Sequence, residues 1–159
     1  MNGRLLIVDD HKQVLKALIQ MLEPEFESIT GLSNPNQIIS CINKEEYDVI
    51  LLDMNFSAGV NTGNEGIYWL NRILKSDPLA AVVMITAYSD VNLAVRAIKE
   101  GATDFVVKPW DNNKLITSLQ AAYKHRQTKI ENKKLRDRQK QINKGSLISL
   151  IPLSGNLRQ

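Results

Sequence analysis

The stretch Leu5-Leu6-Ile7-Val8-Asp9-Asp10 is a short apolar run that ends on two carboxylates. Apolar runs of this length that are rich in Val and Ile are typical of strands buried on both faces. Similar runs lie at 47–52, 81–85 and 103–107, and a weaker one lies at 26–30. The sequence therefore predicts five short strands.

The segments between these runs have the apolar spacing of amphipathic helices, as at 14–22 and 67–74. Residues that favour helix ends stand between them: Ser33-Asn34-Pro35, Ser89-Asp90 and Asp111 as starts, and Gly101 as a stop. Alternating strands and helices in a chain of this length predict one α/β domain, in which helices cover both faces of a parallel sheet.

Polar residues follow four of the predicted strands. Asp9 and Asp10 follow the first, Asp53 the third, Thr86 the fourth and Lys108 the fifth. In a parallel sheet these positions lie at one edge, where functional groups gather. Singly, each has a plainer explanation, since Asp-Asp is common at a helix start and Lys-Pro in a turn. Together they indicate one site.

The residue types at this edge suit phosphoryl chemistry. Converging carboxylates stay ionised at neutral pH only if a cation offsets them, and oxygen ligands favour Mg²⁺ over zinc. Lys108 and Thr86 can contact the oxygens of a bound anion. No Cys, Ser or His triad stands at the predicted strand ends, so the candidate nucleophile is a carboxylate, Asp53 above all.

At this point the chain resembles the receiver domains of two-component response regulators. The motifs that carry the resemblance are Leu6-Ile7-Val8-Asp9-Asp10, Ile50-Leu51-Leu52-Asp53-Met54-Asn55, Val83-Met84-Ile85-Thr86-Ala87 and Phe105-Val106-Val107-Lys108-Pro109. The resemblance covers residues 3–125. It implies a flavodoxin-like fold with a five-stranded parallel sheet in the order 2-1-3-4-5, helices on both faces and an extended C-terminal helix.

The resemblance also implies roles for the residues at the strand ends. Asp53 would be the phosphoacceptor. Asp10 and Asp53 would bind Mg²⁺ directly with the main-chain carbonyl of Asn55, and Asp9 would hold the ion chiefly through water. The phosphoryl donor would be a sensor histidine kinase, and the domain would act in signalling rather than as an enzyme.

Two further residues are implied to respond to the phosphoryl group. Thr86 and Lys108 would contact it, and Thr86 would move toward it. Phe105 stands where the family carries an aromatic switch, three residues before the lysine. An aromatic residue in a strand is also ordinary core, so both interpretations of Phe105 stay open.

Several segments look most like receivers of nitrogen-regulator type, among them Ile85-Thr86-Ala87-Tyr88 and Lys108-Pro109-Trp110. The resemblance therefore implies a transcriptional output. The chain contains no Gly-rich nucleotide loop of the Gly-x-x-x-x-Gly-Lys-Ser/Thr type, and too few residues follow position 145 for a helix-turn-helix. We expect either a fragment of a regulator or a stand-alone receiver that passes phosphoryl groups on.

The segment Met54–Gly66 departs from the family pattern. It reads MNFSAGVNTGNEG, which is about five residues longer than the usual loop and lacks its proline. Its glycines and asparagines allow varied backbone angles, so the loop is either a lid over the phosphoryl group or a tolerated insertion.

The C-terminal part of the chain is basic. Residues 124–144 hold nine Lys/Arg against two Asp/Glu, and no glycine or proline lies between 112 and 144. These features predict a long helix with a basic extension, 126–144. We expect a homodimer, formed either by this helix pairing with a second copy or by the face from the fourth strand to the last helix. Direct nucleic-acid binding is not expected, because a charge run is usually a solvated helix face. Gly145-Ser146 is predicted to end the helix and to begin a flexible tail, 145–159.

The rest of the sequence excludes other classes of protein. Hydrophobic content of 43% without a run of about 20 apolar residues, and the absence of a signal pattern, indicate a cytoplasmic protein without a membrane span. An aspartyl-nucleophile phosphatase would need an acid at the position of Asn55. In a flavodoxin-like cofactor binder, Asp9 and Asp10 would repel the phosphate of the cofactor. Neither histidine, His11 nor His125, is expected to bind metal.

Overall fold

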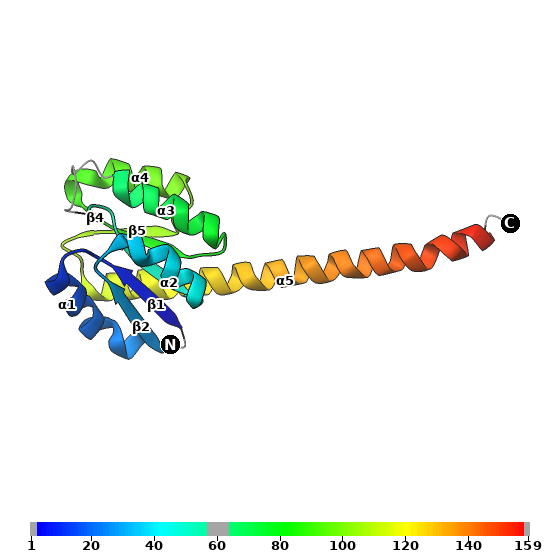
Figure 1. Ribbon diagram of the computed structural model, residues 1–159, viewed down its shortest axis with the longest axis horizontal. Helices are drawn as coiled ribbons and strands as arrows, with labels where there is room; N and C mark the ends of the chain where they lie inside the picture. Colours follow the sequence, from blue (N-terminus) through cyan, green and yellow to red (C-terminus); the bar gives the residue numbers. More distant parts are fainter. Residues whose placement is uncertain (1–2, 57–63, 158–159) are drawn as a thin grey trace. The chain divides into compact units, whose positions relative to one another are not determined.

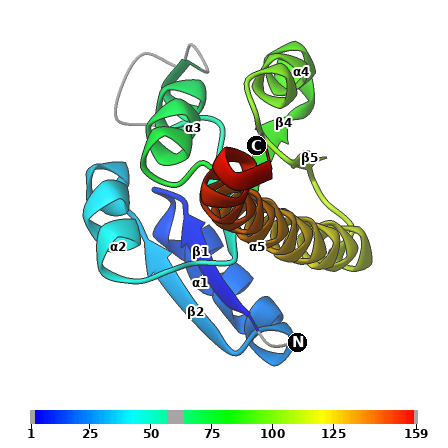
Figure 2. The ribbon, with the colours of Figure 1, turned by 90° about the vertical axis from the view of Figure 1, so that its right-hand side faces the viewer.

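The computed structural model describes residues 3–56 and 64–157, with side chains as far as residue 145. Its strands are β1 (Arg4–Val8), β2 (Ser28–Leu32), β3 (Val49–Asp53), β4 (Val82–Ala87) and β5 (Asp104–Lys108). All neighbours pair in parallel, in the order β2-β1-β3-β4-β5. Figure 2 shows β1 running beside β2 at one end of this sheet. The predicted fold class and strand order are confirmed.

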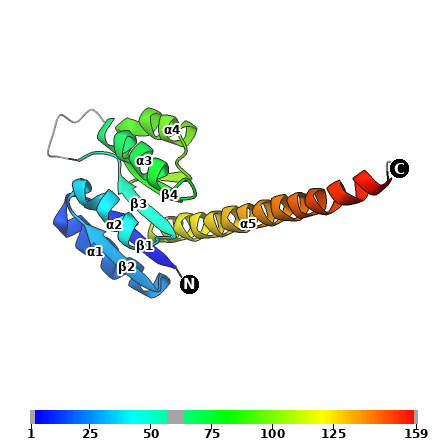
Figure 3. The same cartoon turned by 45° about the vertical axis from the view of Figure 1, so that its right-hand side comes forward.

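Helices connect the strands. They are α1 (Lys12–Leu22), α2 (Ile38–Lys44), α3 (Asn64–Ser76), α4 (Val91–Lys99) and α5 (Asn112–Leu157), with short 3₁₀ turns η1 (Glu23–Glu25), η2 (Pro35–Gln37) and η3 (Tyr88–Asp90). Buried residues of α2, α3 and α4 share one hydrophobic cluster, and those of α1 and the first turns of α5 share another. Figures 1 and 3 show α1 across the sheet from α3 and α4. The helices therefore cover both faces, as predicted.

The central strands explain why the apolar runs are so clear. Every residue of β3 is buried, and so are Leu5–Val8 of β1. Alternate residues of β3 enter opposite clusters, Ile50 and Leu52 on one face and Val49 and Leu51 on the other. A strand packed on both faces needs apolar side chains throughout, and its run is then uninterrupted.

The edge strand β2 was placed two residues too early by the sequence pattern. Ser28–Leu32 contains no fully buried residue, so its apolar pattern is weak. Phe26 is buried at 6% exposure, but it lies before the strand. A buried aromatic outside the strand thus drew the predicted start forward. The other four strands likewise lie within two residues of their predicted ends.

The predicted helix ends agree with local geometry. The Oδ1 of Asn34 accepts a hydrogen bond from Asn36 N at the start of η2, and the Oδ1 of Asp111 accepts one from Asn113 N at the start of α5. Gly101 follows α4 with φ of 118°, a backbone angle that favours glycine after a helix. Asp90 stands at the N-cap of α4 without a capping hydrogen bond from its side chain.

The last helix is longer than the sequence suggested. α5 continues through Gly145 to Leu157, so the prediction that Gly145-Ser146 ends the helix is wrong. Glycine inside a helix costs only about 1 kcal/mol relative to alanine, and nothing packs within 4 Å of a Cβ placed at Gly145. By its contacts the chain forms two compact units, Met1–Arg126 and Gln127–Gln159. None of the described helices is long and apolar enough to cross a membrane.

Candidate functional site

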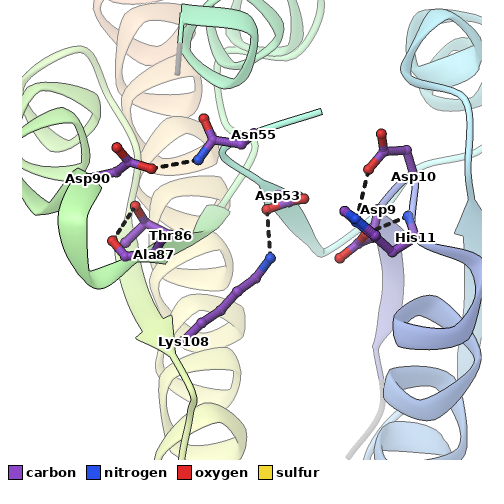
Figure 4. Close-up of polar contacts among 9 residues, drawn as sticks. All are labelled: Asp9, Asp10, His11, Asp53, Asn55, Thr86, Ala87, Asp90 and Lys108. Carbon is purple, nitrogen blue, oxygen red and sulfur yellow. Dashed lines mark hydrogen bonds and ion pairs between the residues drawn. The ribbon is translucent and has the colours of Figure 1, made fainter. Parts of the chain in front are cut away.

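The polar residues predicted at the strand ends meet at one edge of the sheet. Asp53 closes β3, and Thr86 and Lys108 lie at the ends of β4 and β5. Asp9 and Asp10 follow β1, which pairs directly with β3. Figure 4 shows Asp53 between the two aspartates of the first strand and the side chain of Lys108. Parallel pairing brings these residues together, although they lie up to 99 positions apart, between Asp9 and Lys108.

Asp53 lies at the centre of the site and is 2% exposed. Its Oδ1 is 3.3 Å from the Nζ of Lys108. Burial raises the pKa of the Asp53 carboxyl from 3.8 to about 6, and the negative charge of Asp9 adds to this rise, while Lys108 opposes it. Asp53 therefore ionises with difficulty, and a further positive charge beside it would favour its anionic form.

Asp9 and Asp10 form the acidic side of the site. Asp9 is 1% exposed, and its Oδ1 accepts a hydrogen bond from His11 N at 2.8 Å. Among the side chains that the structure describes, Asp9 Oδ2 and Asp53 Oδ2 are buried oxygens without a hydrogen-bond partner. Leaving two buried carboxylate oxygens without a hydrogen bond or a cation costs folding free energy. They are well suited to a metal ion.

His11 joins this group of side chains, although the sequence analysis did not expect it to bind metal. Its Nδ1 is 3.3 Å from Asp9 Oδ1 and 3.2 Å from Asp10 Oδ1. Asp9, Asp10, His11 and Asp53 each place one possible ligand atom within 4.8 Å of the others, so the four could hold a metal ion. The contact arises because the chain turns into α1 directly after His11.

Thr86 lies near the site with its hydroxyl engaged elsewhere. The residue is fully buried, and its Oγ1 donates a hydrogen bond to the carbonyl oxygen of Ala87 at 3.3 Å. Figure 4 shows this bond running along the end of β4, away from Lys108. A side-chain rotation would free the hydroxyl for an anion bound at Asp53.

Asn55 links the site to the start of α4. Its Nδ2 donates a hydrogen bond of 2.7 Å to Asp90 Oδ2 (Figure 4). The sequence singled out Asn55 for its main-chain carbonyl and for the acid it lacks, and Asp90 only as a helix start. The one available signal was that Asp90 follows the β4 end by a few residues. The contact joins the segment after Asp53 to the segment after Thr86.

The segment after Asp53 is held by close packing. Met54 N donates to the carbonyl oxygen of Ile85 at 2.7 Å, and Met54 and Phe56 are buried. A Cβ at Gly66 would lie 2.5 Å from the carbonyl oxygen of Met54, so only glycine allows α3 to begin this close. The middle of the predicted loop, residues 57–63, lies outside the described residues, and both interpretations of the loop remain predictions.

Phe105 is half-buried and packs against the hydrophobic cluster that lies under α2, α3 and α4. This contact agrees with the core interpretation of Phe105. A switching role is not tested by a single arrangement of the side chain, and it remains a prediction.

Comparison with known proteins agrees with this geometry. Residues 5–120 match the family model of the response regulator receiver domain. The C4-dicarboxylate transport transcriptional regulatory protein DctD of Rhizobium meliloti is 26% identical over 156 residues, which cover 98% of this chain and 33% of that protein. The DNA-binding transcriptional regulator NtrC of Salmonella typhimurium is 28% identical over 126 residues, which cover 79% of this chain and 26% of that protein. The predicted likeness to the nitrogen-regulator type is thereby confirmed.

A solved structure shows the same fold at higher identity. The N-terminal signal receiver domain of a two-component system response regulator from Bacteroides fragilis is 46% identical, with a TM-score of 0.71, and the match covers 77% of this chain and 98% of that one. The chain spans a third or less of the length of the regulators DctD and NtrC. Because the family model matches most of the sequence, this chain belongs to the response regulator receiver domain family.

Proposed function

We propose that Asp53 accepts a phosphoryl group from a phosphohistidine of a sensor histidine kinase, in a Mg²⁺-dependent reaction. The observation that carries this proposal is the placement of a buried carboxylate between an acidic pair and a lysine ammonium group, 3.3 Å from Lys108 Nζ. Receiver domains of response regulators are signalling domains that histidine kinases phosphorylate, and this chain is a member of that family.

The donor atoms at the site fit Mg²⁺. Asp9, Asp10 and Asp53 supply carboxylate oxygens, two of them buried without a partner, and hard oxygen ligands are those that Mg²⁺ prefers. We assign Asp10, Asp53 and the main-chain carbonyl of Asn55 as direct ligands and Asp9 as a ligand through water. The bound ion would neutralise charge on the carboxylates and on the phosphoryl oxygens.

One oxygen of Asp53 would then bind the metal ion, and the other would attack the phosphorus atom. The attacking oxygen forms a P–O bond while the P–N bond of the donor breaks, and the imidazole of the kinase leaves. Lys108, already beside Oδ1, would move to an oxygen of the transferred group, where its charge offsets the new negative charge. Thr86 would turn its hydroxyl from Ala87 to another phosphoryl oxygen.

We propose that the movement of Thr86 changes the outer face of β4, β5 and α5, with Phe105 following it inward. The output would be control of transcription, and the chain would act through homodimerisation by α5 or by the face from β4 to α5. The transcriptional relatives support this proposal, although they are longer proteins. A stand-alone receiver that passes phosphoryl groups to another protein is the alternative.

We also propose that the domain does not turn over external phosphate esters. An aspartyl-nucleophile phosphatase needs a side-chain acid to protonate the leaving group, and the residue two positions after Asp53 is Asn55. An amide does not protonate a leaving group, and the Asn55 amide donates its hydrogen bond to Asp90. Slow loss of the phosphoryl group from Asp53 would be the only hydrolysis.

The proposal is tested by incubating the chain with Mg²⁺ and a small phosphodonor such as acetyl phosphate, followed by intact mass measurement. One phosphoryl adduct is expected for the wild type and none for Asp53→Ala. Asp137→Ala is a matched control, because Asp137 is an exposed aspartate of α5. No adduct on the wild type, or an adduct that survives Asp53→Ala, would falsify the assignment.

A further inference from the structure

His11 occupies a place that the proposed Mg²⁺ site does not require. Its ring lies beside Asp9 and Asp10 in Figure 4, on the side of the pocket away from Lys108. The side chain is 55% exposed, and it makes no N-capping hydrogen bond to α1 although it stands at the N-cap. Its ring nitrogen contacts both carboxylates.

The distances around His11 are those between neighbouring ligands of one metal ion. Two ligands about 2.1 Å from the same ion lie roughly 3.0 Å apart in an octahedral site and about 3.4 Å apart in a tetrahedral one. The Nδ1 of His11 lies 3.3 Å from Asp9 Oδ1 and 3.2 Å from Asp10 Oδ1. An ion could thus contact the nitrogen and the carboxylates with little rearrangement.

Asp53 and Asp9 supply an independent sign that a cation belongs here. Both residues are at least nine-tenths buried, and each has one oxygen without a hydrogen-bond partner among the described residues. An imidazole nitrogen changes which cation such oxygens select. Mg²⁺ strongly prefers oxygen, whereas first-row transition ions such as Zn²⁺ bind imidazole and carboxylate together.

We propose that His11 makes the receiver pocket a mixed nitrogen and oxygen site, which binds Zn²⁺ through His11 Nδ1 and the carboxylates in competition with Mg²⁺. This inference rests on the proposed metal site at Asp9, Asp10 and Asp53. It adds to that site a ligand which discriminates between metal ions. In a cell, the identity of the bound ion would then depend on the availability of both metals.

The test measures Zn²⁺ and Mg²⁺ affinity by calorimetry on the full chain without a histidine tag, for the wild type, His11→Ala and His125→Ala. His125 is the matched control, because it is the other of the two histidines and lies in α5. We expect the ratio of Zn²⁺ to Mg²⁺ affinity to fall at least tenfold in His11→Ala and to stay within twofold in His125→Ala. We also expect excess Mg²⁺ to weaken Zn²⁺ binding to the wild type.

A direct reading comes from ¹⁵N-histidine NMR of the wild type. Zn²⁺ should shift the Nδ1 signal of His11 and leave that of His125 in place. An unchanged affinity ratio in His11→Ala, equal losses in both variants, or Zn²⁺ binding that Mg²⁺ does not weaken would each overturn the inference. The phosphoryl adduct in Mg²⁺ alone tests the proposed function separately, since that experiment contains no Zn²⁺.

Discussion

The ionised carboxyl of Asp53 destabilises the folded protein when no metal ion is bound. The pKa of its carboxyl is raised to about 6, first by burial and then by the charge of Asp9, against 3.8 for an unperturbed group. The folded state therefore binds this proton more tightly than the unfolded chain does. The stabilisation is complete below about pH 4 and is lost as the pH rises through about 6. It amounts to roughly 3 kcal/mol at most, at about 1.4 kcal/mol per pKa unit.

This loss can be measured with Asp53→Asn, which removes the ionisation and keeps the shape of the side chain. Without metal, the variant should be more stable than the wild type at pH 7 by roughly 1 to 3 kcal/mol, and the difference should vanish near pH 4. Urea unfolding at a series of pH values measures it, with Asp137→Asn as a control for an exposed aspartate. A difference that is independent of pH would show that burial and Asp9 do not perturb this carboxyl.

The sequence named most of the site because the strand ends are visible in it. Asp53 and Lys108 each interrupt an apolar run, and the order of the sheet then dictates that they meet. The contacts of His11 and Asp90 were not predicted, for a physical reason. Their contacts depend on the direction in which the chain leaves the strand, and residue spacing does not encode that direction.

At the scale of elements, the buried face of α5 ends with a charged residue. Leu115, Leu119 and Ala122 are fully buried, and the next residue on this face is Arg126, at 2% exposure. The guanidinium group lies 2.8 Å from Glu46 Oε1 and 3.0 Å from Asp77 Oδ2. The row of buried residues thus continues by one position as an ion-pairing arginine, which joins α5 to the ends of other elements.

We expect Arg126→Met to destabilise the folded receiver by roughly 1 to 3 kcal/mol, because its charged hydrogen bonds are lost while the carboxylates they leave stay partly solvated. The new side chain fills similar space, but it cannot pair with Glu46 or Asp77, which are 74% and 31% exposed. Arg136→Met is the matched control, because Arg136 is exposed in the same helix. Thermal or urea unfolding followed by circular dichroism compares the two. Equal stability of both variants would mean that the buried arginine contributes nothing beyond its packing.

Strand existence was clearest where burial is strongest, although all five predicted strands lie within two residues of the observed bounds. β3 is covered on both faces, so its run of apolar residues marks the strand, whereas β2 at the edge has no such run. The end of α5 was missed because glycine was taken as a helix stop. A solvent-exposed helix can pass through Gly145 when the residues around it favour helix, and propensity at one position is too small to decide the matter.

At the scale of the whole molecule, the acidic and basic residues are distributed unequally between the two compact units. The unit Met1–Arg126 contains the sheet and the acidic pocket, and the unit Gln127–Gln159 contains the later turns of α5. Ile116 and Tyr123 of α5 pack against the receiver core. Leu135 and Ile142, seven residues apart, are 48% and 54% exposed. These two residues lie on one face of α5 and are the better candidates for a dimer contact.

If α5 carries the signal by pairing with a second copy, the pairing should depend on these two side chains and on the state of Asp53. Analytical ultracentrifugation with Mg²⁺ and beryllofluoride, which mimics an aspartyl phosphate, should show more dimer than the untreated chain. The double variant Leu135→Gln and Ile142→Gln should weaken the dimer at least tenfold, because half-exposed aliphatic side chains contribute roughly 1 kcal/mol each on burial.

The matched control is Asp137→Asn with Lys144→Gln, two exposed positions on the opposite face of α5, because the pair keeps the net charge unchanged. This control should dimerise like the wild type. An identical mass with and without beryllofluoride would argue against dimerisation as the output. An equal loss of dimer in both double variants would show that the effect is not specific to Leu135 and Ile142. Phosphorylation of Asp53 would be intact in either case, so the output and the chemistry of the receiver can be judged separately.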